Sequence, residues 1–204
     1  MSVSSVLFST RSGSDDAAPA TRYGVIDRVP IDAQLVALAR EDRDAAFELL
    51  YNAYRGRIFT FLLRLSGSAE AADDLVQDTF LKVHKAVGRL DDDQKLLPWL
   101  YRIANNTAID HLRHRKRITW LSWGGVHGTA EEPHGADEQA GSRARADIAD
   151  ILQQMPADNA AALLLHALEG YSYQEIAAIQ GCSLTAARSR IARARAAFKD
   201  RYPT

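Results

Sequence analysis

The sequence has little cysteine and no long apolar run, and each absence excludes a class of protein. Its 204 residues include one cysteine, Cys182, so an internal disulfide is impossible and a reducing compartment is expected. No apolar run approaches the roughly 20 residues that a transmembrane helix needs. The opening stretch MSVSSVLFSTRSGSDD lacks the cationic and apolar blocks of a signal peptide. We therefore expect a cytoplasmic protein that does not insert into a membrane.

An excess of either charge is also missing, since 25 Lys and Arg stand against 26 Asp and Glu. This balance argues against a general polycation. The charge is nevertheless uneven, because residues 113–117 and 188–201 are basic whereas 91–93 and 131–138 are acidic. Any nucleic acid would have to be held by local basic patches.

Strand-like alternation is absent as well, and apolar residues recur at helical spacing in most of the chain from Asp32 onward. Asp32 is expected to cap a short helix, and Asp44 to open a long one that ends at Gly67. Pro98 is expected at the first position of another helix. We predict an all-α fold of two small helical domains joined by a flexible linker. The predicted parts are a flexible tail at 1–29, a first domain at 30–117, the linker at 118–142 and a second domain at 143–204.

The predicted helix that follows Ser68 has one apolar stripe and an opposite face carrying Asp74, Gln77 and Asp78. Two carboxylates four residues apart could hold a metal or act as an acid/base pair. The sequence offers no nucleophile or convergent histidine beside them. A solvated face or a protein-docking face therefore fits the pattern better than catalysis does.

The helix predicted after Pro98 mixes aromatic, amide and cationic side chains. Such a mixture is typical of single-stranded DNA binding, through stacking on rings, hydrogen bonds from amides and phosphate contacts from Arg and Lys. A helix with a cationic last turn is also a common solvated helix, and this pattern alone leaves both readings open. The residues concerned are Trp99, Tyr101, Asn105, Asn106, Arg113, Arg115, Lys116 and Arg117.

Residues 170–198 predict two helices joined by a tight turn. Ser172 and Glu175 have the spacing of a capping box, and Gly181 supplies a left-handed residue at which the first helix ends. Ser183 then caps a second helix. One face of that helix is apolar and the other cationic, which is the pattern of a DNA-binding helix-turn-helix; a helical hairpin with a solvated basic face is the alternative. The cationic residues are Arg188, Arg190, Arg193 and Arg195.

Four histidines raise the alternative of a helical metal-dependent enzyme. His111 and His114 lie one helical turn apart, but His127 and His134 fall in the predicted linker and have no Cys partner. We predict no cofactor and no enzymatic activity.

Three segments, in this order, resemble the extracytoplasmic-function group of sigma-70-family sigma factors, the promoter-specificity subunits of bacterial RNA polymerase. DLVQDTFLKVHKAV at 74–87 is similar to the polymerase-docking helix of that family. WLYRIANNTAIDHLRHRKR at 99–117 is similar to its promoter −10 helix, and residues 155–195 to its promoter −35 domain. The resemblance covers residues 31–202. The main alternative is a freestanding helix-turn-helix regulator that binds duplex DNA without polymerase.

The resemblance implies a function and a set of contact residues. The chain would direct promoter recognition, −10 melting and transcription initiation by core RNA polymerase, through its β′ coiled coil and β subunit, under control of an anti-sigma factor that is membrane-bound in some relatives. Polymerase binding is implied for Asp74, Gln77 and Asp78, with Phe80 packed beneath them. Contact with −10 DNA is implied for Asn105, Asn106, Arg113, Arg115 and Lys116, and the loop at 90–97 would close over a flipped base. Contact with −35 DNA is implied for His166, Arg188, Ser189, Arg190 and Arg193.

Overall fold

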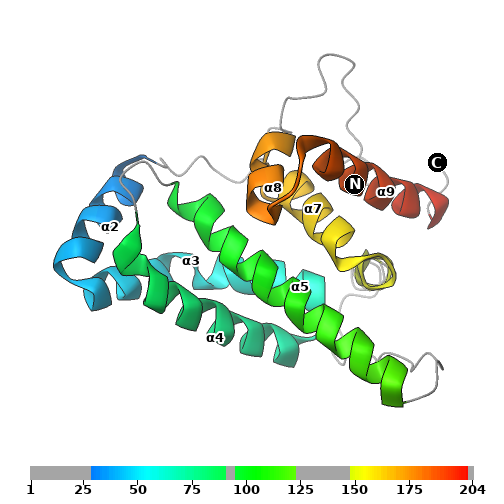
Figure 1. The fold of residues 1–204 in the computed structure, drawn as a ribbon, viewed down its shortest axis with the longest axis horizontal. Coiled ribbons are helices and arrows are strands. Elements are labelled where there is room, and N and C mark those ends of the chain that lie inside the picture. Colours follow the sequence, from blue (N-terminus) through cyan, green and yellow to red (C-terminus); the bar gives the residue numbers. More distant parts are fainter. Residues whose placement is uncertain (1–28, 91–94, 123–147, 202–204) are drawn as a thin grey trace, which may run out of the picture.

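The computed structural model describes residues 29–90, 95–122 and 148–201, and every element in these ranges is helical (Figure 1). The all-α fold class is confirmed. The predicted tail at 1–29 and linker at 118–142 lie almost entirely outside the described residues. The elements are α2 (Val29–Glu41), α3 (Arg43–Ser66), α4 (Ala69–Ala86), the short 3-10 helix η1 (Val87–Arg89), α5 (Leu96–Ser122), a helical stretch at 148–154, α7 (Ala157–Ala167), α8 (Tyr173–Gln180) and α9 (Leu184–Arg201).

The boundaries of α3 and α4 follow from capping side chains. Asp42, in extended conformation, accepts hydrogen bonds from the backbone N–H groups of Asp44 and Ala45 at 3.1 and 3.0 Å. The helix therefore opens at Asp42, two residues before the predicted start, and Asp44 lies in its first turn, where a carboxylate suits the helix dipole. Gly67 ends α3 at a φ of 74°, and Ser68 caps α4, both as predicted.

Two other helix boundaries differ from the prediction. The helix α2 begins at Val29, so Asp32 lies within it and not at its cap. The helix α5 begins at Leu96, which places Pro98 third in the first turn, where the N–H that proline lacks would have no helical partner. This helix continues to Ser122, five residues beyond the predicted end of the first domain, because no Gly or Pro interrupts the chain before Gly124.

The helices α2 to α5, here called the N-terminal group, pack around one apolar core. The antiparallel helices α3 and α4 meet along an aromatic cluster in which the Phe80 ring lies 4.8 Å from Tyr51 and 6.3 Å from Phe47. The helix α5 crosses both, and the Lys82 ammonium of α4 donates to the Thr107 hydroxyl of α5 at 2.9 Å. This packing leaves one long face of α4 uncovered.

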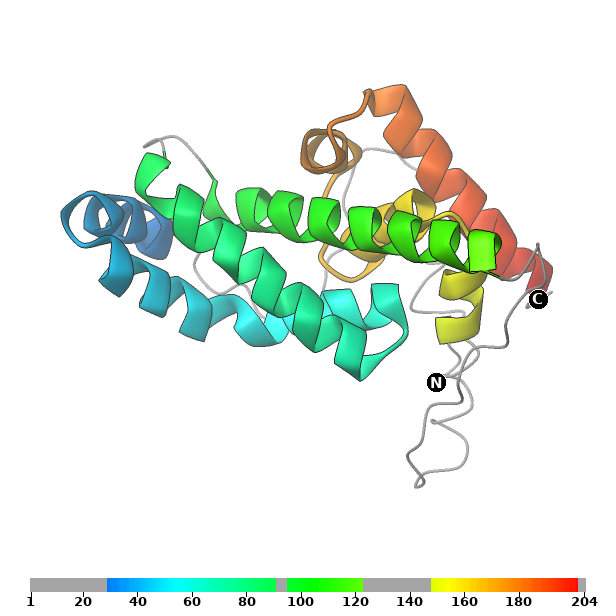
Figure 2. The ribbon, with the colours of Figure 1, turned by 60° about the horizontal axis from the view of Figure 1, so that its bottom comes forward.

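Residues 148–154 with α7, α8 and α9 form the C-terminal group. It lies against α5 and α3, so that α5 lies between α4 and the C-terminal group (Figure 1, Figure 2). The buried side chains of the two groups form one continuous hydrophobic cluster. Within the described ranges, no helix combines the length and apolar character that crossing a membrane requires.

Candidate polymerase-docking and promoter-binding surfaces

The uncovered face of α4 carries the predicted acidic and amide residues. Asp74, Gln77 and Asp78 are all exposed, as their helical spacing predicted. Leu81 follows one turn later on the same face, and 54% of it is exposed. An exposed leucine among carboxylates and an amide gives this surface an apolar centre. We call these four residues the docking face.

Phe80 lies beneath the docking face and is not part of it. Only 2% of the residue is exposed, and its ring packs edge-on against Tyr51. The neighbouring carboxylate Asp73 points elsewhere, toward Arg55 of α3, with 3.5 Å between oxygen and nitrogen. The docking face is thus supported by a buried aromatic cluster.

The structure divides the predicted −10 residues of α5 into exposed and buried positions. Asn106, Arg113 and Arg115 are exposed, whereas Asn105 is 3% exposed. The Asn105 side-chain amide donates weakly to the side-chain Oδ1 of Asn106 at 3.4 Å, and its own Oδ1 has no partner among the described residues. Helical periodicity could not show this, because α5 packs against α3, α4, α7 and α8 and so has more than one covered side. Two parts of this predicted site fall outside the described residues, namely the Lys116 side chain and residues 91–94 of the loop.

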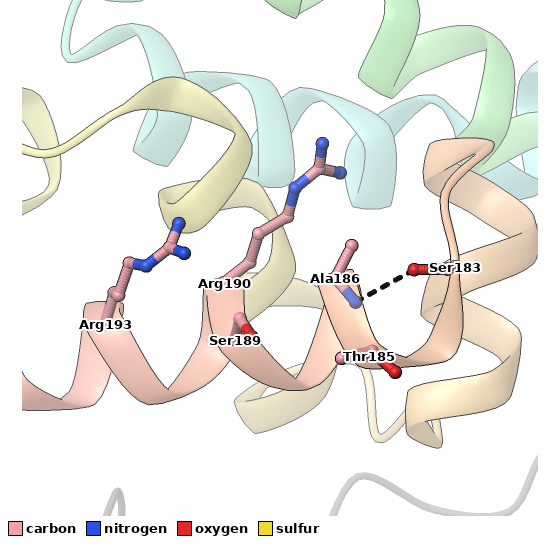
Figure 3. A pocket seen from close by; sticks show the side chains of 6 residues that line it. All are labelled: Ser183, Thr185, Ala186, Ser189, Arg190 and Arg193. Carbon is pink, nitrogen blue, oxygen red and sulfur yellow. Dashed lines mark hydrogen bonds between the residues drawn. The ribbon is translucent and has the colours of Figure 1, made fainter.

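The helix-turn-helix forms with the predicted caps. Ser172 and Glu175 make both bonds of the capping box, and Gly181 ends α8 at a φ of 60°. The Ser183 hydroxyl accepts from the backbone of Ala186 at 3.2 Å and opens α9. The first turns of α9 line an open hollow of about 400 Å³ (Figure 3). Its lining residues are Ser183, Thr185, Ala186, Ser189, Arg190 and Arg193.

Arg190 and Arg193 extend from successive turns of α9 toward the same side of this hollow (Figure 3). Arg190 is held within the C-terminal group, because one guanidinium nitrogen donates to the Gln180 amide oxygen at 2.8 Å and the other lies 3.5 Å from Asp158. Arg193 is exposed. The hollow therefore combines one oriented guanidinium, one exposed guanidinium and several hydroxyls, a donor-rich set that suits phosphate or base edges.

The remaining cations of α9 have different surroundings. The Arg188 guanidinium lies over the Tyr173 ring, 5.9 Å from its centroid. Tyr173 in turn packs against His166, with ring centroids 4.9 Å apart. This stack connects the exposed surface of α9 to the interior of the C-terminal group.

His166 is buried, with 5% of the residue exposed, so its placement does not support the predicted phosphate contact. Its Nδ1 donates to the backbone oxygen of Tyr171 at 2.9 Å. Burial lowers the pKa of His166, the bond to Tyr171 partly opposes this, and the charge of Arg195 lowers it further. The sequence signal that indicates burial is the unbroken apolar run ALLLHA, since a helix that is apolar all round is buried.

The histidine pair of the metal alternative lies on α5. His111 is partly exposed and His114 exposed, while His127 and His134 lie outside the described residues. Among the side chains that the structure describes, no three His, Cys, Asp or Glu gather into a possible metal-binding group.

Both groups of helices match known protein families. A family model described as sigma-70 region 2 matches residues 50–118, and one described as sigma-70 region 4 matches residues 145–198. The RNA polymerase sigma factor CarQ of Myxococcus xanthus is 35% identical over 151 residues, which cover 74% of this chain and 86% of that protein. The RNA polymerase sigma-H factor of Pseudomonas aeruginosa is 34% identical over 176 residues, which cover 82% of this chain and 91% of that protein.

Two solved structures share the fold. The sigma factor RpoE from Bartonella quintana, in complex with the anti-sigma factor NepR, gives a TM-score of 0.63 at 30% identity, over 76% of this chain and 94% of that chain. CnrH, in complex with the cytosolic domain of CnrY, gives a TM-score of 0.61 at 27% identity, over 83% of this chain and 96% of that chain.

Proposed function

The chain belongs to the extracytoplasmic-function group of RNA polymerase sigma factors, and we propose that it docks on core polymerase through the docking face of α4. The observation that carries this proposal is the docking face itself. Three polar side chains and Leu81 share one uncovered surface, and buried aromatic rings hold it in place. Carboxylates around an apolar centre are complementary to a partner surface with cations around an apolar patch. The proposed partner surface is the β′ coiled coil, and further contacts are proposed with the β subunit.

Promoter contact is proposed for two separate surfaces. On α5, Asn106 would help to hold a flipped −10 base, with Arg113, Arg115 and Lys116 on the backbone. On α9, the hollow and its arginines would lie in the major groove of the −35 element, with Arg188, Ser189, Arg190 and Arg193 as the contacts. Asn105 and His166 are left out of these direct contacts because both are buried.

Control by an anti-sigma factor is also proposed, and the two structural neighbours support it, since one is a complex with an anti-sigma factor and the other with a cytosolic domain. A chain with these partners acts in the cytoplasm, as a non-catalytic subunit. An anti-sigma factor with a membrane anchor would hold it near the membrane.

Charge reversal on the docking face tests this function. We expect Asp74→Lys with Gln77→Ala to weaken binding to core polymerase at least tenfold and to abolish transcription in vitro, because a lysine would meet cations on the partner. The matched control is Asp73→Lys, which makes the same change at the adjacent carboxylate, directed toward Arg55. Binding can be measured by fluorescence anisotropy and transcription on a genomic fragment library with mapped start sites.

Two outcomes would contradict the proposal. Unchanged core binding and transcription in the double variant would show that the docking face does not contact polymerase. Sequence-specific duplex binding by a wild-type chain that does not bind core polymerase would favour the freestanding regulator instead.

A further inference from the structure

Arg190 of α9 is oriented by contacts from two neighbouring helices. Its Nη1 donates to the Gln180 Oε1 at 2.8 Å, and its Nη2 lies 3.5 Å from the Asp158 Oδ1. Gln180 is the last residue of α8, and Asp158 lies in the first turn of α7. Three helices of the C-terminal group therefore meet at one guanidinium. We call Asp158, Gln180 and Arg190 the arginine clamp.

The Gln180 side-chain amide is bonded at both of its ends. Its Nε2 donates to the backbone oxygen of Asp158 at 3.0 Å, while its Oε1 accepts from Arg190. A backbone oxygen can only accept and a guanidinium can only donate, so the amide satisfies both partners in one orientation only. The amide oxygen is therefore directed at Arg190, and the amide nitrogen is directed at α7.

The turn of the helix-turn-helix brings the clamp together. Gly181 reverses the chain at a φ of 60°, and the backbone N–H of Cys182 donates to the Ala177 oxygen at 2.9 Å. The end of α8 thereby lies beside the second turn of α9. The bond from Arg190 to Gln180 connects the two helices across their turn, so the direction of this guanidinium depends on a residue outside α9.

Water has limited access to the clamp, because the Arg190 and Asp158 side chains are only 23% and 27% exposed. Hydrogen bonds that involve a charged group are strong, and a surrounding of low polarity strengthens them further. An unrestrained arginine loses the freedom of a long side chain when it binds a ligand. A clamped arginine has already lost much of that freedom when the chain folds. The clamp therefore prepares Arg190 to donate in one direction.

Arg190 can still bind a ligand while it is clamped. A guanidinium carries several N–H donors, and the contacts to Gln180 and Asp158 engage only one donor on each Nη atom. Arg190 also lines the open hollow at the first turns of α9, beside Ser189 and Arg193 (Figure 3). The Nε–H and the second donor of each Nη remain for a base edge in the major groove, where arginine binds guanine through two hydrogen bonds.

We propose that Gln180 is a positioning residue for promoter recognition, which sets the base preference of the −35 contact by directing the Arg190 guanidinium. The proposal rests on the proposed function, because it requires that α9 contacts the −35 element. It adds a determinant of specificity that lies on α8 and is not among the residues lining the hollow. Asp158 supports the same orientation, but its other carboxylate oxygen accepts from Arg113 of α5 at 3.1 Å. A change at Asp158 would alter two arginines, so Gln180 is the residue to test.

The test measures base preference in the complex with core polymerase. Each variant transcribes a pool of templates made from one promoter of the genomic fragment library, in which every −35 base pair is changed in turn, and transcripts are counted by sequencing. We expect Gln180→Met, which keeps the length of the side chain but removes both hydrogen bonds, to reduce the preference at one base pair about fivefold. The matched control is Gln174→Met, which makes the same change at an exposed position of α8 and should keep the wild-type preference.

The double variant Gln180→Met with Arg190→Ala separates positioning from a general structural role. If Gln180 acts through Arg190, then Arg190→Ala alone removes the preference at that base pair, and adding Gln180→Met changes nothing further. A further loss in the double variant would overturn the inference, as would an equal loss at every −35 base pair in Gln180→Met. An unchanged preference in Gln180→Met, or the same loss in Gln174→Met, would also overturn it.

Arg193→Ala distinguishes failure of this inference from failure of the proposed function. Arg193 lines the same hollow but is not part of the clamp. If Arg193→Ala lowers transcription while Gln180→Met keeps the wild-type preference, α9 contacts the promoter and the positioning role of Gln180 is wrong. If Arg190→Ala and Arg193→Ala both leave transcription and base preference unchanged, the proposed −35 contact fails, and the positioning role fails with it.

Discussion

At the scale of single residues, His166 shows how burial converts a potential cation into a neutral structural group. Its Nδ1 must carry a proton to donate to the Tyr171 carbonyl, because that oxygen only accepts. Neutral imidazole can make this bond, so the hydrogen bond to Tyr171 does not require a charge on the ring. Burial and the nearby Arg195 charge both oppose a second proton.

The lowered pKa of His166 predicts a loss of stability in acid. The unfolded chain takes up a proton near the ordinary value of 6.5, whereas the folded chain does so only at lower pH. The unfolded state therefore binds more protons below about pH 6.5, and the free energy of unfolding falls there as pH decreases. Urea unfolding at pH 7.5 and 5.5 measures the difference. We expect His166→Gln to be less stable at pH 7.5 but to lose less on acidification.

The control for this prediction is His114→Gln, which changes an exposed histidine and should keep the wild-type response to pH. Equal acid losses in His166→Gln and the wild type would show that other groups account for the pH dependence.

At the scale of helices, two glycines have opposite roles. Gly56 lies inside α3, where an added Cβ would meet no atom within 4 Å. An added Cβ at Gly181 would also meet no atom within 4 Å, but the φ of this residue is 60°, a conformation that costs an L residue free energy. We expect Gly56→Ala to stabilise the fold by about 0.5–1 kcal/mol and Gly181→Ala to destabilise it by about 1–2 kcal/mol. Urea unfolding of both variants checks this, and effects of the same sign would contradict it.

The helix ends show how far the sequence could predict the fold. Ser68, Gly67 and the capping box act through neighbouring residues, so their chemistry is visible in the chain. The sequence predicts the starts of α2 and α3 two or three residues too late, because more than one acidic side chain lies near each start and only the folded geometry selects the cap. The sequence predicts the end of α5 too early, because a cationic turn is compatible with a helix end but does not enforce one.

The candidate site likewise has parts that the local sequence predicts and parts that depend on tertiary packing. The polar face of α4 follows from helical periodicity, because the opposite face supplies the core. Which polar residues of α5 and α7 are covered depends on packing between the groups, through pairs separated by 45 and 112 residues in the sequence. Periodicity carries no information on such contacts. Asn105 and His166 are the two DNA contacts implied by the resemblance that the structure finds buried. His166 is buried within its own group, against Tyr171 and Tyr173.

At the scale of the whole molecule, the buried cluster that spans both groups makes their folding interdependent. Each group is small, and a small helical group buries only a modest part of its apolar surface alone. Packing against α5 therefore contributes to the stability of the C-terminal group, while the polar contacts decide how tightly the two are coupled.

This coupling predicts that the free wild-type chain unfolds in a single transition. A variant that weakens the interface between the groups should unfold in two less strongly coupled transitions. Glu169→Gln leaves the half-buried Arg57 without an ionic partner, so we expect about 1–2 kcal/mol of destabilisation and a van't Hoff enthalpy below the calorimetric one. Asp73→Asn is the matched control, because it removes an exposed ion pair within the N-terminal group and should change stability by less than about 0.5 kcal/mol. Differential scanning calorimetry measures both. A Glu169→Gln chain that still unfolds in one transition, with the ratio of van't Hoff to calorimetric enthalpy unchanged, would show that this ion pair does not couple the two groups.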